Sequence, residues 1–318
     1  MAQQTKAAYY TEFGGIDKLQ VGSLDLPNLS AGDVQLLVKA AGVNPVDAVV
    51  RAGHFAQVVP SVFPTVPGWD VCGIVEKCGP GVTRLAVGDE VYGYVRQPVA
   101  QHGTFAERIV VPENLLAKSP AKLSWVEAGG LPLAGLTAYQ SVIKAGQLKA
   151  GETILILGAS GGVGGSAIQL AKDAGATVIA VASADSAGHM KKLGADYTID
   201  YKAGPVAETV KKMAPDGVDL LFDAISGDTL TQSLATLKPT GRLISVLNDG
   251  KALQLPAGVH FQHVMAQPSV PDLDHLRELA DAGKLTVPIA ATFSLDDVKK
   301  AFEQIESHHT TGKVVIVP

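Results

Sequence analysis

A short apolar run followed at once by a glycine-rich turn is the most restrictive feature of this sequence. Thr153–Leu157 has the pattern of a buried strand, residues 158–164 (Gly-Ala-Ser-Gly-Gly-Val-Gly) form the turn, and Ser166–Ala174 has the pattern of a helix. Gly161 would let the backbone approach a ligand, and Gly164 would let the helix pack close to the strand. The helix N-terminus would offer unpaired N–H groups to an anion. This order predicts a binding site for the pyrophosphate of a dinucleotide.

The turn departs from the usual G-x-G-x-x-G fingerprint, because Ala159 stands in place of the first glycine of the motif. The pattern alone is therefore weak, and its position between strand and helix carries the prediction. The alternative is a tight turn that binds nothing. So many glycines would then cost chain entropy without a structural need.

The distribution of strand and helix patterns predicts two domains. The first part of the chain has short β-rich runs separated by glycine and proline, which favours a small barrel-like β domain. After Thr153, apolar strands alternate with helices, which indicates a parallel sheet covered on both faces. We expect a doubly wound α/β cofactor domain over residues 125–284 and a β-rich substrate domain over residues 1–124 and 285–318. Lys313–Val317 would return to the first domain as a strand.

Composition and charge exclude several classes of protein. With 47% hydrophobic and 18% charged residues, the chain is typical of a compact globular protein. A net charge of −5 without a block of basic residues disfavours nucleic-acid binding. The absence of a long apolar stretch and the polar N-terminus predict neither a membrane span nor a signal peptide. The two cysteines, Cys72 and Cys78, are too few for a disulfide framework, so we expect buried thiols and a cytoplasmic protein.

The residue after the second strand of the cofactor domain bears on the choice of dinucleotide. An acidic residue there normally accepts the ribose 2′-hydroxyl of NAD, but this chain has Ser183. A serine can donate a hydrogen bond to a 2′-phosphate without repelling it, so we expect NADP(H) rather than NAD(H). Asp185 could still serve NAD(H), while a phosphate would need cationic help from Lys191, Lys192 or Lys202.

Motifs distributed over essentially the whole chain resemble those of one family. Gly151-Glu152-x-x-Leu155-x-x-x-Ala159-Ser160-Gly161-Gly162-x-Gly164, continued by Gln169 and Lys172, is similar to the signature of the quinone oxidoreductase and zeta-crystallin group. This group belongs to the medium-chain dehydrogenases/reductases. The other matching segments are residues 44–47, 66–70, 88–93, 131–139 and 311–313. The resemblance implies a GroES-like catalytic domain beside a Rossmann-type cofactor domain.

The same resemblance implies a reaction without zinc. Zinc alcohol dehydrogenases of this superfamily carry a cysteine where this chain has Asn44 and a histidine where it has Trp69. Neither residue here is a zinc ligand, and the four-cysteine lobe of those enzymes is absent. Without a Lewis acid, the favoured hydride acceptor is one that delocalises charge, such as a quinone or an enone.

The resemblance also implies which residues contact the cofactor. The residues expected near the nicotinamide and its ribose are Asn44, Thr137, Val246, Leu247 and Asn248. Those expected at the pyrophosphate are Ala159, Ser160, Gly161, Gly162 and Val163. Those expected near the adenosine phosphate are Ser183, Lys192 and Tyr201. Lys313 is a further candidate, with an ordinary surface lysine as the alternative.

No proton donor stands out in the sequence. Tyr92 and His54 are weak candidates for a catalytic acid, with a packed or surface role as the alternative to each and solvent water as the alternative to both. Asp47 and Arg51 have the i, i+4 spacing of a helical ion pair. Asp70 follows the lost zinc position and either steers a neighbouring side chain or is a hydrogen-bonded turn residue.

These observations together predict NADPH-dependent reduction of quinones, or of the C=C bond of α,β-unsaturated carbonyl compounds, by hydride transfer without a metal. The alternatives are an enoyl-thioester reductase and a non-catalytic, crystallin-like protein that binds NADPH. The family resemblance also implies a homodimer formed through an edge strand at Val259–Ala266.

Overall fold

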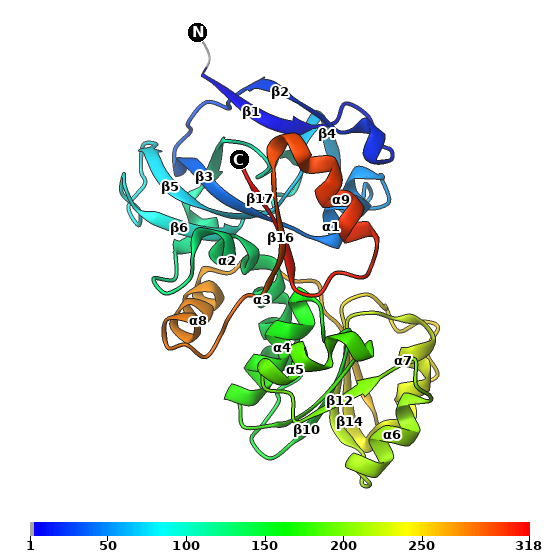
Figure 1. The fold of residues 1–318 in the computed structure, drawn as a ribbon. Helices are drawn as coiled ribbons and strands as arrows, with labels where there is room; N and C mark the ends of the chain where they lie inside the picture. Colours follow the sequence, from blue (N-terminus) through cyan, green and yellow to red (C-terminus); the bar gives the residue numbers. More distant parts are fainter. Residues whose placement is uncertain (1–2) are drawn as a thin grey trace. The chain divides into compact units, whose positions relative to one another are not determined.

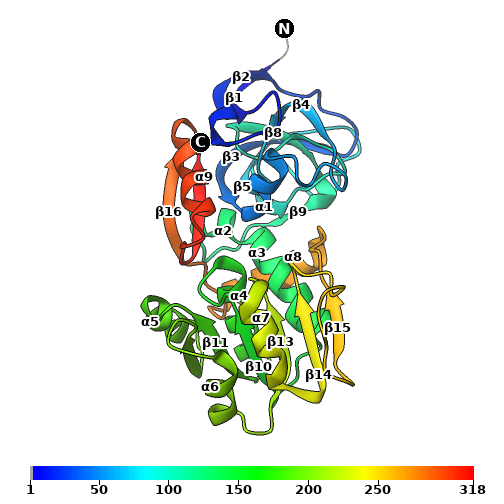
Figure 2. The same ribbon diagram turned by 90° about the vertical axis from the view of Figure 1, so that its right-hand side faces the viewer.

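The computed structural model describes residues 3–318, which Figures 1 and 2 show as ribbons from two directions. The chain divides into two compact units. The first comprises the residues up to Leu133 together with Pro268–Gly283 and Val287–Pro318, and the second comprises Ala134–Gln267 and Lys284–Thr286.

A six-stranded parallel sheet forms the centre of the second unit, with the strand order β12-β11-β10-β13-β14-β15. The strands are β10 (Thr153–Leu157), β11 (Thr177–Ala182), β12 (Tyr197–Asp200), β13 (Val218–Asp223), β14 (Leu237–Ser245) and β15 (His260–His263). Successive strands run outward from β10, first to one side and then to the other. This is the order of a dinucleotide-binding fold, and its switch point lies at β10. The predicted doubly wound domain is confirmed.

Helices cover both faces of this sheet, which explains why its strands are continuous apolar runs. On one face, Leu155 and Val181 pack with residues from the helices α6 and α7. The alternate residues, such as Ile154 and Val178, are also fully buried and face the other side. The helices of this unit are α4 (Gly162–Asp173), α5 (Ala187–Lys192), α6 (Val206–Met213) and α7 (Gly227–Ser233). The predicted helix at 131–145 is α3 (Pro132–Ala138) continued by a π-helix (Tyr139–Ala145).

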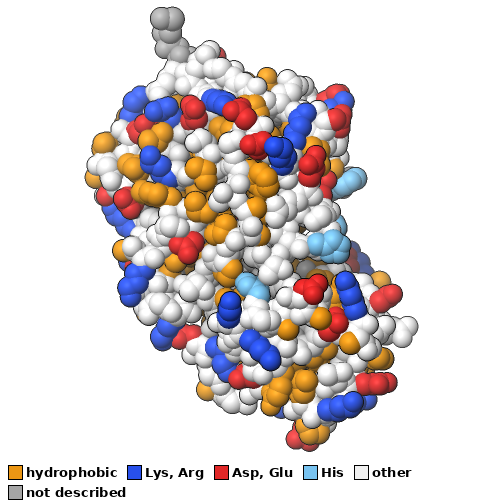
Figure 3. Space-filling model, in the orientation of Figure 1, with side chains coloured by type: hydrophobic (Ala, Val, Ile, Leu, Met, Phe, Trp, Pro, Cys, Tyr) orange, Lys and Arg blue, Asp and Glu red, His pale blue; other side chains and the backbone are white. Residues whose placement is uncertain are grey.

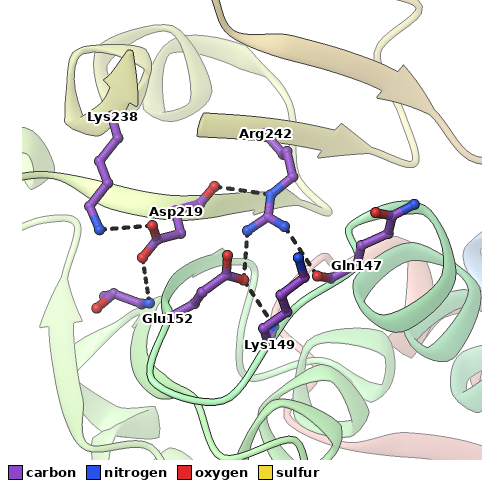
Figure 4. A network of polar contacts seen from close by, with 7 residues as sticks. Gln147, Lys149, Glu152, Asp219, Lys238 and Arg242 are labelled. Carbon is purple, nitrogen blue, oxygen red and sulfur yellow. Dashed lines mark hydrogen bonds and ion pairs between the residues drawn. The ribbon is translucent and has the colours of Figure 1, made fainter. Parts of the chain in front are cut away.

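A network of charged side chains links the strands at the amino-terminal edge of this sheet (Figure 4). Arg242 of β14 donates to the Glu152 carboxylate at 2.7 Å. The Asp219 carboxylate of β13 accepts from Lys238 at 2.7 Å and from the backbone N–H of Thr153 at 2.9 Å. These bonds tie β10, β13 and β14 together at that edge. The opposite edge is formed by the carboxyl ends of the same strands.

The first unit is built on a seven-stranded sheet with the order β16-β17-β3-β5-β6-β9, in which β8 also pairs with β3. Its strands are β3 (Asp33–Val43), β5 (Asp70–Cys78), β6 (Glu90–Tyr94), β8 (Arg108–Pro112), β9 (Leu116–Lys118), β16 (Ile289–Ser294) and β17 (Lys313–Val317). A hairpin of β1 (Gln4–Tyr9) with β2 (Gln20–Asp25) and a pair of β4 (Ser61–Val66) with β7 (Ala100–His102) complete it. As predicted, the last strand returns: β17 pairs antiparallel with β3.

Helix α2 (Trp125–Gly130) lies unusually close to β3. A capping box starts the helix, because the Ser124 N–H donates to the Glu127 carboxylate at 2.8 Å and the Glu127 N–H donates back to the Ser124 hydroxyl. A Cβ at Gly129 would lie only 2.7 Å from the Cβ of Ala40. The other helices of this unit are α1 (Pro45–Arg51), α8 (Val270–Asp281) and α9 (Val298–Glu306).

Helix α8 belongs to the first unit, although the sequence placed it in the cofactor domain. The hydroxyl of Tyr92 on β6 donates to the backbone carbonyl of Leu273 at 2.5 Å, and the Leu273 and Leu276 side chains are fully buried. An amphipathic pattern tells which face of a helix is buried but not which neighbour covers it. The predicted boundaries at 124/125 and 284/285 therefore differ from the observed division.

The surface carries both signs of charge. On the face shown in Figure 3, Lys and Arg side chains are interspersed with Asp and Glu. Within residues 3–318, no helix has the length and apolar character needed to cross a membrane.

Candidate cofactor site

The strand register of the second unit brings the ends of its strands into one row. Leu157 of β10 pairs with Val181 of β11 and with Asp223 of β13, and Asp223 pairs with Ser245 of β14. The loops that follow these strands therefore emerge at the same carboxyl edge, where ligands of such sheets bind. The residues on these loops, with Tyr201 after the neighbouring β12, include most of the predicted contacts: Ala159–Val163, Ser183, Tyr201 and Val246–Asn248.

The glycine turn has the geometry that the sequence predicted. A Cβ at Gly164 would lie 2.3 Å from the Gly158 carbonyl oxygen, so helix α4 can approach β10 only with glycine at this position. A Cβ at Gly161 would meet only that same oxygen, at 3.8 Å, and would otherwise project into open space. Gly164 thus permits packing, whereas Gly161 leaves room beside the backbone.

The N-terminus of α4 is suited to an anion. Its N-cap is Gly161, which supplies no side-chain hydrogen bond, and its first turn contains no acidic residue. The first N–H groups of the helix therefore have no capping partner, and the positive end of the helix dipole is not neutralised. Ala159 is an exception among the predicted contacts, because it is fully buried and its N–H already donates to the Val181 carbonyl at 3.0 Å. The uncapped N–H groups and the positive dipole end at the start of α4 fit a pyrophosphate group.

Two further signature residues anchor α4 at its other end. The amide oxygen of Gln169 accepts from the Thr286 backbone N–H at 2.8 Å and from its hydroxyl at 2.9 Å, and the Gln169 Nε2 donates to the Thr286 carbonyl at 3.0 Å. Lys172 donates to the Asp196 carboxylate at 2.8 Å and to the Ala176 carbonyl at 3.0 Å. No role for these residues was predicted beyond their place in the family signature. In the structure they anchor helix α4, which follows the glycine turn.

The residues predicted for the adenosine phosphate lie around the ends of β11 and β12. Tyr201 directly follows β12, its N–H donates to the Ala182 carbonyl at 3.3 Å, and its ring is 42% exposed. Ser183 directly follows β11 and is partly exposed. Lys202 stands over the Tyr201 ring, with its Nζ 5.7 Å from the ring centre. Lys192 is exposed in the last turn of α5. Ser183, Tyr201 and Lys202 are thus the group that the register brings together.

A buried polar cluster in the first unit joins Asn44, Asp70 and Lys313. The Asn44 Nδ2 donates to the Asp70 carboxylate at 2.9 Å, and the Lys313 Nζ donates to the Asn44 Oδ1 at 2.5 Å and to the Val43 carbonyl at 3.1 Å. The Lys313 Nζ also lies 3.7 Å from an Asp70 oxygen. The other Asp70 oxygen accepts from the Leu133 N–H at 2.7 Å. These bonds fix the orientation of the Asn44 amide, so Asp70 steers a neighbouring side chain.

Burial governs the protonation of this cluster. It raises the pKa of Asp70 to about 6, although Lys313 and the hydrogen bonds from Asn44 and Leu133 favour the charged form. It also raises the pKa of Asp47 to about 7, with the nearby Asp70 charge adding to the effect. Burial lowers the pKa of Lys313, against the attraction of Asp70 and Asp47. Lys313 is only 5% exposed, so the surface-lysine alternative is wrong.

The predicted ion pair between Asp47 and Arg51 is also wrong. The Asp47 carboxylate instead accepts from the Asn44 N–H at 2.8 Å, at the start of α1. Arg51 donates to the Glu306 carboxylate at 2.8 Å and lies 4.8 Å from the centre of the Phe302 ring. A carboxylate three residues after an N-cap can accept from the N-cap N–H, so the Asp47 carboxylate is engaged by Asn44 and not by Arg51. Arg51 pairs instead with Glu306 of the distant helix α9.

The two weak candidates for a catalytic acid occupy different environments. Tyr92 is fully buried, its hydroxyl donates to the Leu273 carbonyl, and burial raises its pKa well above 10. These observations favour the packed alternative for Tyr92. His54 follows α1 and is exposed, and its backbone N–H donates to the Val49 carbonyl at 3.1 Å. Thr137, predicted near the nicotinamide, is buried in α3 of the chain.

The positions that hold zinc in related alcohol dehydrogenases have other neighbours here. The Asn44 amide is engaged by Asp70 and Lys313, and the buried Trp69 indole packs edge-on against Tyr94 with ring centres 6.1 Å apart. Within residues 3–318, no group of three His, Cys, Asp or Glu side chains is placed to hold a metal ion. Cys72 is buried as expected, whereas Cys78 is only partly buried.

Two buried polar residues at the carboxyl edge were not predicted from the sequence. Asp223 and Ser245 end β13 and β14, and each accepts hydrogen bonds from the backbone of the loop that follows it. A polar residue at the end of an apolar strand of a parallel sheet was the available signal. Their pairing depends on the strand register.

Comparisons with known proteins identify the family of the chain. Residues 30–121 match the family model described as alcohol dehydrogenase GroES-like domain, and residues 193–316 match the one described as zinc-binding dehydrogenase. The chain is 36% identical to the NADPH-dependent alkenal/one oxidoreductase, chloroplastic, of Arabidopsis thaliana, over 99% of this chain and 80% of that protein. It is 37% identical to the 2-methylene-furan-3-one reductase of Solanum lycopersicum, over 99% of this chain and 79% of that protein.

A solved structure supports the same family. The quinone oxidoreductase from Coxiella burnetii matches with a TM-score of 0.90 at 29% identity, covering 99% of this chain and 100% of that one. The GroES-like domain predicted for the first part of the chain is confirmed by the family model. By its sequence, its fold and its glycine turn, the chain belongs to the quinone oxidoreductase and alkenal/one reductase group of the medium-chain dehydrogenases/reductases.

Proposed function

We propose that this protein is an NADPH-dependent reductase of quinones or of the C=C bond of α,β-unsaturated carbonyl compounds, and that it works without a metal. The observation that carries the proposal is the uncapped N-terminus of α4 beside the open space at Gly161, at the switch point of the sheet. The printed names of the relatives, an alkenal/one oxidoreductase and a furanone reductase, support the substrate class.

The proposed contacts are divided by the part of the cofactor that they would hold. Backbone groups of Ser160, Gly161, Gly162 and Val163 would hold the pyrophosphate, while Ser183, Lys192 and Tyr201 would hold the adenosine phosphate. Asn44, Thr137, Val246, Leu247, Asn248 and Lys313 would hold the nicotinamide and its ribose. Asn44 is suited to this, because Asp70 and Lys313 hold its amide in one orientation.

The chemistry needs one hydride and one proton. NADPH supplies the hydride when it is bound. In an enone the hydride adds to the β-carbon and the proton to the α-carbon. A quinone takes up the hydride and a proton and becomes a hydroquinone. Because the Tyr92 hydroxyl is engaged by Leu273, we propose solvent water as the acid, with His54 as the side-chain alternative.

A substrate panel tests the reaction. NADPH oxidation is measured with 9,10-phenanthrenequinone, 1-octen-3-one and crotonyl thioester, and turnover of the quinone or the enone is expected. Turnover of the thioester alone would support the enoyl-thioester alternative. Micromolar NADPH binding with no turnover of any of the three would support the crystallin-like alternative. Stoichiometric zinc in the active protein would contradict a metal-free reaction.

The choice of cofactor is tested at Ser183. The native protein is expected to prefer NADPH over NADH in kcat/KM by about tenfold or more, roughly 1.4 kcal/mol. Ser183→Asp is expected to remove this preference, because a carboxylate repels the 2′-phosphate and accepts from the 2′-hydroxyl of NADH. Ser183→Asn is the control of the same size without the charge. A native protein that already prefers NADH tenfold would contradict the proposal.

Assembly and location complete the proposal. Strand β15 has a neighbour on only one side in the described sheet, so the predicted homodimer would form along this edge. We also propose a cytoplasmic location. Light scattering on the purified protein would test the first, and fractionation of the source cells would test the second.

A further inference from the structure

The ends of β13 and β14 are joined by a buried chain of hydrogen bonds that the proposed function does not yet use. Asp223 and Ser245 are both fully buried. The Ser245 hydroxyl donates to one oxygen of the Asp223 carboxylate at 2.6 Å. The same Ser245 oxygen accepts from the backbone N–H groups of Leu247 at 3.2 Å and Asn248 at 2.9 Å.

The direction of every bond in this chain is fixed. A backbone N–H can only donate, so the Ser245 oxygen must be the acceptor for Leu247 and Asn248. Its single proton is then left for the Asp223 carboxylate, which accepts it at 2.6 Å. The serine hydroxyl therefore has one stable orientation.

The second Asp223 oxygen holds the neighbouring loop. It accepts from the Ile225 N–H at 3.1 Å and the Ser226 N–H at 2.8 Å. Ser226 has a φ of +59°, a backbone conformation that non-glycine residues rarely adopt. One carboxylate and one hydroxyl thus hold four backbone N–H groups, two in each of two adjacent loops, and one of these loops has an unfavourable conformation.

We propose that Asp223 and Ser245 are positioning residues that hold the loop 246–248 in the conformation that receives the nicotinamide half of the cofactor. This inference rests on the proposed function. Without the Ser245 oxygen, the N–H groups of Leu247 and Asn248 would lose their acceptor, and the bond from the Val246 N–H to the Asp223 carbonyl at 3.1 Å would be left to hold the loop to the sheet. Leu247 is 61% exposed, so burial of its side chain does little to hold the loop. A site of this kind needs such support to keep its geometry.

Ser245→Ala tests the proposal through a comparison of two ligands. The Kd for NADPH is expected to rise about tenfold, because alanine cannot accept from Leu247 or Asn248. The Kd for 2′,5′-ADP, which contains only the adenosine half, is expected to stay within about twofold of the native value. Both are measured by fluorescence or calorimetric titration, with kcat as a further readout that should fall.

Two more variants make the test specific. In Asp223→Asn, the amide oxygen can still accept from Ile225 and Ser226, but the amide nitrogen is a donor facing a Ser245 oxygen that already accepts twice. The same split between the two ligands is expected, so a Ser245→Ala protein that fails to fold would not end the test. Ser233→Ala is the matched control, because the Ser233 side chain is equally buried but bonds only to the Thr229 carbonyl within α7. Both of its Kd values should be native.

Three results would overturn the proposal. Native Kd values for both ligands in Ser245→Ala and Asp223→Asn would show that the loop does not depend on these residues. A parallel loss of both ligands would show a general structural role only. Native protein that binds 2′,5′-ADP but not NADPH, or neither, would overturn the proposed function itself before any variant is compared.

Discussion

Gly161→Ala is expected to weaken NADPH binding by about tenfold or more while the protein stays folded. The new methyl group would project into open space, with the Gly158 carbonyl oxygen 3.8 Å away as its only neighbour, so no protein atom needs to move. That space lies at the N-cap of α4, where the backbone is proposed to meet the pyrophosphate. The Kd from NADPH fluorescence and the melting temperature are measured together.

Gly164→Ala is the contrasting control. Here the methyl group would lie 2.3 Å from the Gly158 carbonyl oxygen and 2.6 Å from the Ala159 Cα, so α4 must move away from β10. Overpacking of this kind typically costs about 1–3 kcal/mol of stability. A loss of stability is therefore expected for Gly164→Ala and not for Gly161→Ala. Native NADPH affinity in Gly161→Ala would contradict a pyrophosphate site at this turn.

Lys313→Met is expected to lower the free energy of unfolding by about 3–5 kcal/mol at pH 8, which is the usual cost of removing one partner from a buried pair of charges. The Lys313 ammonium lies 3.7 Å from the Asp70 carboxylate, and both side chains are buried. Methionine fills a similar volume but leaves Asp70 without a cation. The measurement is denaturant unfolding of the native and variant proteins from pH 4 to pH 8.

The pH dependence distinguishes this cause from a simple packing defect. The pKa of Asp70 is raised to about 6 in the folded protein, and removing the ammonium of Lys313 should raise it further. Between about pH 4 and the folded pKa, the folded state keeps a proton that the unfolded state has released, so stability falls as pH rises. Both proteins lose this stability up to about pH 6, and the variant continues to lose it above that pH, so the deficit of Lys313→Met should be smallest below about pH 6 and larger at pH 8. Lys313→Met combined with Asp70→Asn should recover most of it, and a deficit that is equal at all pH values would contradict this explanation.

The strand, turn and helix of the proposed anion site could be predicted from the sequence because their determinants are local. Thr153–Leu157, the glycine turn and the following helix are contiguous, and the space left by Gly161 and the packing of Gly164 follow from the absence of a Cβ at those positions. The alternation of apolar strands and helices likewise predicted the doubly wound sheet.

Most of the polar contacts could not be predicted, because they join residues that are distant in the sequence; the contact of Asp47 with Asn44, three residues away, is a local one. Asp47 and Arg51 have the correct spacing for an ion pair, yet their partners are the Asn44 N–H and Glu306. Tyr92 is a candidate acid by its sequence, but its hydroxyl donates to the carbonyl of Leu273, a helix residue 181 positions further along the chain.

The sequence by itself thus determined where the proposed anion site lies, since a strand, a glycine-rich turn and a helix N-terminus are consecutive in the chain. Only the tertiary structure decided which distant polar groups meet. Strand register places Asp223 beside Ser245, and the return of β17 to β3 buries Lys313 against Asn44. The physical reason is that backbone geometry acts over a few residues, whereas the partner of a buried charge is set by which distant elements pack together.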